Sequence, residues 1–265
     1  MARAKRHYLP GQVWHITHRC HKREFLLKFN KDRKRWIHWL FEAKRRYGLT
    51  ILNYVVTSNH IHLLVVDDKD RTTIPKSIQL TAGRLAQEYN QRKNRKGAYW
   101  EDRYHATAIE TGSHLMRCLV YIDLNMVRAG MVSHPAEWTF GGYNEIQFPR
   151  RKSILINYGK LAVLSGCDSY ASFQHLHRNL INAALETDKI RKEAFWSQSI
   201  AVGEEQFVNQ IKKKLGSKAL GRKKYSLDDG YYLREETVSY IPDYDVKNSE
   251  IGPKNDYEWN MSPDI

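Results

Sequence analysis

The sequence has few cysteines and no long apolar run. Its three cysteines are far apart and form no Cys-x-x-Cys pair: Cys20, Cys118 and Cys167. This pattern favours neither a disulfide framework nor a zinc knot, and we expect a cytoplasmic protein. No apolar stretch approaches the roughly 20 residues needed to span a bilayer, so no membrane partner is expected. The basic N-terminus is followed by residues 8–11, Tyr-Leu-Pro-Gly, and not by the apolar segment of a secretory signal.

The charge of the chain is strongly positive and unevenly distributed. The 265 residues carry a formal net charge of +14 and have a pI near 9.6. Residues 226–265 contain ten acidic side chains against three Lys or Arg, so the first 225 residues form a basic body and the last forty an acidic tail. A basic body predicts a polyanionic partner, most often nucleic acid, although solubility alone is the alternative explanation.

Hydrophobic periodicity predicts an alternation of strands and helices in the first half of the chain. The expected order is strand, helix, strand, strand, helix, strand and a further helix, over Gln12–Arg19, Asn30–Tyr47, Leu49–Thr57, His60–Val66, Thr73–Arg92, Tyr99–Ile109 and His114–Ala129. This is the split β-α-β order, which predicts an α+β fold with an antiparallel sheet and two helices on one face. The extra helix is expected on the other face or beside the sheet.

The second half of the chain has mainly helical patterns. They cover Tyr158–Leu164, Tyr170–Leu185, Asp188–Ser197 and Glu204–Leu215. We therefore predict three parts: a domain at 1–149, a helical C-terminal extension at 150–225 and an acidic tail at 226–265.

The segment Ser58-Asn59-His60-Ile61-His62-Leu63-Leu64 contains the first candidate site. On a strand, His60 and His62 point to the same side, while Ile61 points to the other. Two imidazoles on one side can bind a single divalent metal ion. The alternative is that both are polar residues on a solvated face.

Tyr121 and Asn125 form the second candidate. Four residues apart on one helix, their side chains would project together. Placed against the histidine face, they would complete a site in which His60, His62 and the Asn125 amide oxygen hold the cation and Tyr121 is the nucleophile. A phenolic oxygen that attacks phosphorus forms a phosphotyrosine, which conserves the energy of the phosphodiester. The alternatives are a core or surface tyrosine and a helix-end asparagine.

These motifs resemble a known family. The His-Ile-His segment is similar to the histidine motif of the HUH single-strand nucleases, and Tyr121-Ile122-Asp123-Leu124-Asn125-Met126-Val127-Arg128-Ala129-Gly130 is similar to the tyrosine segment of the Y1 transposases. Within these, the REP-associated tyrosine transposases, related to the IS200/IS605 transposases, are most similar. The segments 14–20 and 100–104 also resemble that group, so the resemblance covers roughly residues 8–145. Met126 departs from the family, which usually has proline there.

The resemblance implies a ferredoxin-like fold with His60, His62 and Asn125 as ligands of Mg²⁺ or Mn²⁺. It implies that Tyr121 attacks single-stranded DNA and leaves a 5′-phosphotyrosine and a free 3′-OH. The expected substrate is single-stranded DNA beside a hairpin, as in REP elements. The relatives act as monomers or homodimers, and both states stay open here.

Basic and aromatic residues outside these motifs are candidates for DNA contacts, because single strands are held by electrostatics and base stacking. The candidates are Arg19, Lys22, Arg23, Arg84, Trp100, Arg103, Tyr104, Arg117 and Arg128. Their alternative roles are solvated charges or core aromatics. A further basic group could grip a hairpin stem: Lys212, Lys213, Lys214, Lys218, Arg222, Lys223 and Lys224. The acidic tail could cover the basic groove as a mimic of DNA.

Three functions are consistent with these features. The first is a metal-dependent tyrosine transposase. The second is a non-catalytic nucleic-acid-binding module of ferredoxin-like fold, which needs no histidine pair. The third is a metal-dependent hydrolase that uses water, in which Tyr121 is dispensable.

Overall fold

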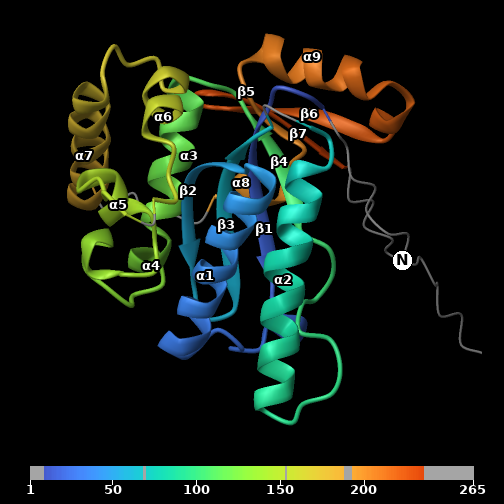
Figure 1. Cartoon of the computed structure of the whole chain (residues 1–265). Coiled ribbons are helices and arrows are strands. Elements are labelled where there is room, and N and C mark those ends of the chain that lie inside the picture. Colours follow the sequence, from blue (N-terminus) through green and yellow to red (C-terminus); the bar gives the residue numbers. More distant parts are fainter. Residues whose placement is uncertain (1–8, 68–69, 153, 188–192, 236–265) are drawn as a thin grey trace, which may run out of the picture.

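Seven strands form one sheet within the part of the chain that the computed structural model describes, residues 9–67, 70–152, 154–187 and 193–235. The order across the sheet is β2-β3-β1-β4-β5-β7-β6 (Figure 1). Neighbouring strands are antiparallel except β4 and β5, which are parallel. The strands are β1 (Val13–Arg19), β2 (Thr50–Val56), β3 (His60–Val66), β4 (His105–Ile109), β5 (Ala201–Gly203), β6 (Arg222–Leu227) and β7 (Gly230–Glu235).

Helices cover both faces of this sheet. The long helices α1 and α2 lie side by side against one face of β2, β3, β1 and β4 (Figure 1). Arg35 of α1 donates to Glu88 of α2 through Nε at 2.8 Å, which ties the pair together. The α-helices are α1 (Asn30–Tyr47), α2 (Thr73–Arg92), α3 (Ser113–Asp123), α4 (Asn125–Arg128), α5 (Tyr143–Gln147), α6 (Tyr158–Leu164), α7 (Tyr170–Glu186), α8 (Phe195–Gln198) and α9 (Glu205–Leu215), and three short 3₁₀ turns are η1 (His21–Arg23), η2 (Pro135–Glu137) and η3 (Gly216–Ala219).

The first half of the chain has the predicted β-α-β-β-α-β order and the sheet order β2-β3-β1-β4. Strand β1 pairs with β3 on one side and with β4 on the other, so the two halves of the motif interlock. The predicted α+β, ferredoxin-like fold is confirmed. Helix α2 has the predicted bounds, and α1 starts and ends at the predicted residues, with Gly48 at φ +67° after its last turn.

The alternation of side chains along β3 separates the core from the candidate site. Tyr54 of β2 lies beside Leu63 of β3 and contacts Trp36 of α1, with 6.4 Å between the ring centroids. Leu63 therefore faces α1 and α2. Since successive strand residues alternate, His62 faces the opposite side.

Helix α3 covers that opposite side. The Asn53 side chain of β2 donates from Nδ2 to Oδ1 of Asp123, at the end of α3, at 3.0 Å. The predicted continuous helix from 114 to 129 is wrong, because Leu124 has a ψ of 4° and separates α3 from α4. Asp123, whose carboxylate is bonded inside the protein, is the last residue of α3, and α4 begins at Asn125.

Two further predictions about strands need correction. The predicted strand Tyr99–Ile109 is shorter: β4 begins at His105, Trp100 forms an isolated bridge with Cys20, and residues 101–103 are exposed. The predicted extension at 150–225 is helical in α6, α7 and α9, but the chain beyond 149 also supplies three strands. Strand β5 pairs with β4, so this region continues the sheet.

Part of the predicted acidic tail, residues 226–235, belongs to the β6–β7 hairpin, and residues 236–265 lie outside the described residues. The boundaries at 149 and 225 stay predictions. In the described part of the chain, no helix has the length and apolar character required to cross a membrane.

Candidate active site

The two motif histidines lie on the α3 side of the sheet. Their ring centroids are 5.0 Å apart. His62 is buried and His60 half-buried. The Nδ1 atom of His60 lies 2.7 Å from Oδ1 of Asn59 and 3.0 Å from Oγ1 of Thr57. Because an amide oxygen only accepts hydrogen bonds, His60 carries its proton on Nδ1, and Nε2 keeps the lone pair that a metal ligand needs.

Asn125 reaches the same histidine pair from α4. Its Nδ2 lies 3.0 Å from Nε2 of His62. The interruption at Leu124 therefore does not remove Asn125 from the site, although the residue no longer shares one uninterrupted helix with Tyr121.

His15 is a third histidine at this place, and the motif analysis missed it. Its Nε2 lies 2.8 Å from Nδ1 of His62, and its Nδ1 lies 2.8 Å from the backbone oxygen of Trp196. Burial lowers the pKa of His15 to about 4 and that of His62 well below its ordinary value. Both rings are therefore neutral near pH 7, which is the state that binds metals. The sequence offers one signal for His15: on the predicted strand 12–19 it points to the same side as Thr17. The structure shows that Thr17 lies opposite His62.

Tyr121 lies next to these histidines. Its ring centroid is 5.9 Å from that of His62 and 6.1 Å from that of His15. The guanidinium carbon of Arg128 is 4.2 Å from the centroid of the Tyr121 ring. Burial raises the pKa of Tyr121, while the charge of Arg128 and a hydrogen bond with Ser197 act in the opposite direction. The site thus combines a nucleophile candidate with a group that favours its charged form.

Helix α8 covers the tyrosine. Trp196 is fully buried, and its ring centroid lies 6.1 Å from that of Tyr121. Ser197 bonds the Tyr121 side chain, and only 6% of Tyr121 is exposed. The predicted helix that includes Trp196 is much shorter in the described residues, and its role as a cover was not predicted. In this conformation a DNA backbone cannot reach the phenol.

The predicted DNA contacts fall into two groups. Arg128 lies at the site, and Arg19 is exposed at the end of β1, directly opposite His60. Lys22 and Arg23 are exposed in η1, Arg103 is exposed in the loop before β4, and Tyr104 is buried.

Of the other three predicted contacts, two lie on the opposite face of the sheet, and the third, Arg117, lies with its guanidinium carbon 5.9 Å from the centroid of the Trp196 ring. Arg84 and Trp100 belong to the opposite face: Arg84 lies over Trp39, and Trp100 donates to the backbone oxygen of Ala82 in α2 at 3.0 Å. Arg117 donates to the backbone oxygen of Asp229 at 2.9 Å. The structure therefore places Arg84 and Trp100 away from Tyr121.

The residues at the site fit a divalent cation. Within the described part of the chain, no three His, Cys, Asp or Glu side chains gather into a metal-binding group, so the candidate donors would be two imidazoles and an amide. Two ligands that share one cation at right angles lie about 3 Å apart, given metal–ligand bonds of about 2.0–2.2 Å. The 3.0 Å between Asn125 and His62 matches this spacing, and a half-turn of the amide presents its oxygen. Water and phosphate oxygens would supply the remaining positions.

A buried polar network holds α3 beside the site. The carboxylate of Asp123 accepts hydrogen bonds from Asn53 of β2 at 3.0 Å and from Nε2 of His177 in α7 at 2.9 Å. Gln147 of α5 is bonded to the other nitrogen of His177 at 3.0 Å. Asp123 thus joins the helix that carries Tyr121 to both the sheet and the C-terminal helices.

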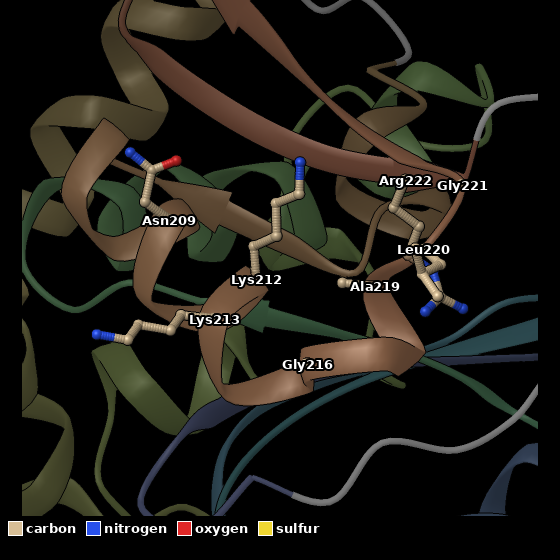
Figure 2. A pocket seen from close by; sticks show the side chains of 8 residues that line it. All are labelled: Asn209, Lys212, Lys213, Gly216, Ala219, Leu220, Gly221 and Arg222. Atoms are coloured by element: carbon tan, nitrogen blue, oxygen red, sulfur yellow. The ribbon is translucent and has the colours of Figure 1, made fainter.

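A cationic hollow of about 500 Å³ lies at the end of α9. Lys212 and Lys213 extend from α9, and Arg222 extends from the start of β6 (Figure 2). Nε and Nη1 of Arg222 are buried and have no hydrogen-bond partner among the described residues. The positive charge of the two lysines makes the hollow suited to an anionic ligand. The lining residues are Asn209, Lys212, Lys213, Gly216, Ala219, Leu220, Gly221 and Arg222.

Comparison with known proteins agrees with the motifs. Residues 11–125 match the family described as "Transposase IS200 like". This segment runs from β1 to the first residue of α4 and contains the three histidines, Tyr121 and Asn125. The resemblance of the motifs to the IS200-like transposases is thereby confirmed over this segment, which is less than half of the chain.

Two solved structures are also similar. One is described as a REP-associated tyrosine transposase bound to a REP hairpin, with 21% identity, a TM-score of 0.44, and coverage of 55% of this chain and 84% of that chain. The other is a putative transposase from Deinococcus radiodurans R1, with 16% identity, a TM-score of 0.32, and coverage of 49% and 97%. No curated protein matches the chain.

Proposed function

We propose that this protein is a metal-dependent transposase that cuts and rejoins single-stranded DNA with Tyr121 as the nucleophile. The observation that carries the proposal is the meeting of Tyr121, His62 and Asn125 from three separate elements at one place. Within the proposal, His60, His62 and Asn125 hold Mg²⁺ or Mn²⁺, as the resemblance to the Y1 transposases implies. When bound, the cation would polarise a non-bridging phosphate oxygen and position the scissile bond.

The proposed chemistry is a transesterification. The phenolic oxygen of Tyr121 forms a bond to phosphorus, and the bond from phosphorus to the 3′-oxygen breaks. The phenol loses its proton to solvent, and the departing oxygen gains one, which leaves a 5′-phosphotyrosine and a free 3′-OH. Attack of a 3′-OH on the same phosphorus reverses the step and joins strands without ATP. The guanidinium of Arg128 stabilises the phenolate during both steps.

Helix α8 must leave its place before this chemistry begins, because Trp196 and Ser197 cover the phenol. Arg19, exposed opposite His60, is suited to contact the incoming backbone. A module that stacks bases on an open sheet is a weaker candidate, because α3 covers the face on which His62 lies.

The cationic hollow at α9 suits the second part of the substrate, a hairpin stem. Lys212 and Lys213 would bind its phosphates, and this region lies on β6 and α9, apart from Tyr121. The REP-hairpin substrate itself is proposed from the resemblance of the motifs to the REP-associated group.

Covalent capture tests the proposal. The full chain is incubated with labelled single-stranded hairpin DNA and Mg²⁺ or Mn²⁺, then denatured. The wild type and the Tyr143→Phe variant, a buried tyrosine in α5, should both become labelled, and Tyr121→Phe should not. Labelling of Tyr121→Phe would refute the proposal, and DNA cleavage without a covalent adduct would favour the water-using hydrolase.

A further inference from the structure

Four groups at the candidate site form one continuous chain of hydrogen bonds. It runs from the backbone oxygen of Trp196 to Nδ1 of His15 at 2.8 Å, and from Nε2 of His15 to Nδ1 of His62 at 2.8 Å. It ends with Nε2 of His62 and the Asn125 amide at 3.0 Å. Both rings are buried and nearly parallel, at 17° to each other.

The Trp196 end of this chain fixes its direction. A backbone oxygen only accepts hydrogen bonds, so Nδ1 of His15 carries the proton and donates. In a neutral imidazole the other nitrogen is then an acceptor. Nε2 of His15 therefore accepts a hydrogen bond from Nδ1 of His62, and Nε2 of His62 is left with the lone pair.

The Asn125 amide, as it is oriented in this structure, agrees with this direction. Its Nδ2 group can only donate, so Nε2 of His62 must accept. Each of the three contacts then has one donor and one acceptor. In the opposite direction, an unprotonated Nδ1 of His15 would face the backbone oxygen of Trp196, so two acceptors would meet. At the other end, a protonated Nε2 of His62 would face the N–H of Asn125, so two donors would meet.

We propose that His15 is a positioning residue that selects Nε2 of His62 as the metal-binding nitrogen. This inference rests on the proposed function for the presence of the metal, but the tautomer itself does not depend on it. A histidine that ligates a metal commonly donates its second N–H to a neighbouring acceptor, which fixes the tautomer and the ring orientation. Here the acceptor is another neutral histidine, held in turn by α8.

The backbone oxygen that accepts from His15 comes from the helix that covers the phenol. Trp196 belongs to α8, the same helix that covers Tyr121. The nitrogen of His62 is therefore preset while the phenol is still covered, before DNA enters. The nitrogen that we assign to the metal is thus already unprotonated in the closed, DNA-free protein.

The tautomers can be measured directly in the metal-free full chain by ¹⁵N NMR of labelled histidine side chains at pH 7.5. We expect His15 and His62 both to be protonated on Nδ1 and unprotonated on Nε2. In His15→Phe, which removes the acceptor for Nδ1 of His62, the fraction of His62 protonated on Nδ1 should fall, because only the Asn125 amide then still favours that tautomer. A wild-type His62 protonated on Nε2 would overturn the inference.

Mn²⁺ affinity measured by calorimetry tests whether His15 helps His62 to bind the metal. His15→Phe should weaken Mn²⁺ binding about 10- to 100-fold, the usual effect of removing such a partner. His15→Gln keeps an acceptor and should stay within about threefold of the wild type on the same grounds. The matched control is His18→Phe: His18 is also buried on β1 and faces a backbone oxygen, that of Asp102, at 2.8 Å on the other side of the sheet.

Two outcomes contradict different claims. Equal Mn²⁺ affinity of His15→Phe and the wild type, or an equal loss in His18→Phe, would overturn the positioning role of His15. Failure of the wild type to bind Mn²⁺, with His62 protonated on Nδ1 as expected, would instead overturn the metal-dependent function.

Discussion

The guanidinium of Arg128 lies over the ring of Tyr121, with its central carbon 4.2 Å from the ring centroid, and Nη2 donates to the backbone oxygen of Tyr121 at 2.7 Å. The two residues are seven positions apart, on α4 and α3, on either side of the break at Leu124. The arrangement joins a positive charge to a group that must become negative in order to attack.

Replacing Arg128 with Gln should slow formation of the covalent adduct about 10- to 100-fold, because the phenolate loses a stabilising charge. It should also move the rise of rate with pH to higher pH, since Arg128 lowers the pKa of Tyr121 against the effect of burial. The measurement is the adduct rate from pH 6 to 10. Arg84→Gln, which removes a guanidinium over an aromatic ring on the other face, is the control. An unchanged pH profile in Arg128→Gln would count against the role of Arg128.

The buried histidines predict that the metal-free protein loses stability in mild acid. His15 has a folded-state pKa of about 4 against 6.5 when unfolded, so between these values the unfolded chain binds more protons. Stability is therefore full above pH 6.5 and falls as the pH drops towards 4. By pH 5 His15 alone should remove about 2 kcal/mol. Urea unfolding at pH 7 and pH 5 measures this loss, which should be smaller in His15→Gln. An identical loss in both proteins would contradict the assignment.

Helix α8 should open when DNA binds. The backbone N–H groups of Ser197 and Ser199 bond to Ala194 and Phe195 at 3.1 and 3.3 Å. A helix of four residues is unstable on its own, so these amides should exchange slowly only while α8 packs against the rest of the protein. Hydrogen exchange at 195–199 should become faster on addition of single-stranded DNA, whereas α7 should not change. Adduct formation without faster exchange in this segment would show that the phenol is reached in another way.

The cationic hollow should contribute to hairpin affinity through phosphates. The double variant Lys212→Gln/Lys213→Gln should weaken hairpin binding and reduce the salt slope of log K against log salt by about 1 per lost phosphate contact. The control is Lys31→Gln/Lys34→Gln, two exposed lysines on α1. Similar salt slopes for the two double variants would remove this surface from the proposed substrate path.

The first half of the fold was predictable because its signals are local. The periodicity of α1 and α2, the stop at Gly48 and the alternation around Ile61 each follow from a short stretch of sequence. The later strands gave weak signals. Strand β5 has three residues and depends on its pairing with β4, and β6 begins with Arg-Lys-Lys, which resembles a solvated loop as much as a strand.

The candidate site was predictable only where its residues belong to motifs. His60, His62, Tyr121 and Asn125 stand in two short segments with recognisable spacing, and the structure brings them together. His15 and Trp196 are 181 residues apart, and only the pairing of β1 with β4 and of β4 with β5 makes them neighbours. Arg84 and Trp100 were placed near the site on charge and aromatic character alone, which do not specify a face of the sheet.

The most direct test is to locate the DNA on the protein. After covalent capture, nuclease trimming and trypsin digestion, residues 118–128 form a peptide with one tyrosine, Tyr121, because Arg117 and Arg128 bound it. The account predicts that mass spectrometry finds a 5′-phosphorylated nucleotide on Tyr121 in this peptide. An adduct on a different residue, or cleaved DNA with this peptide unmodified throughout, would contradict it.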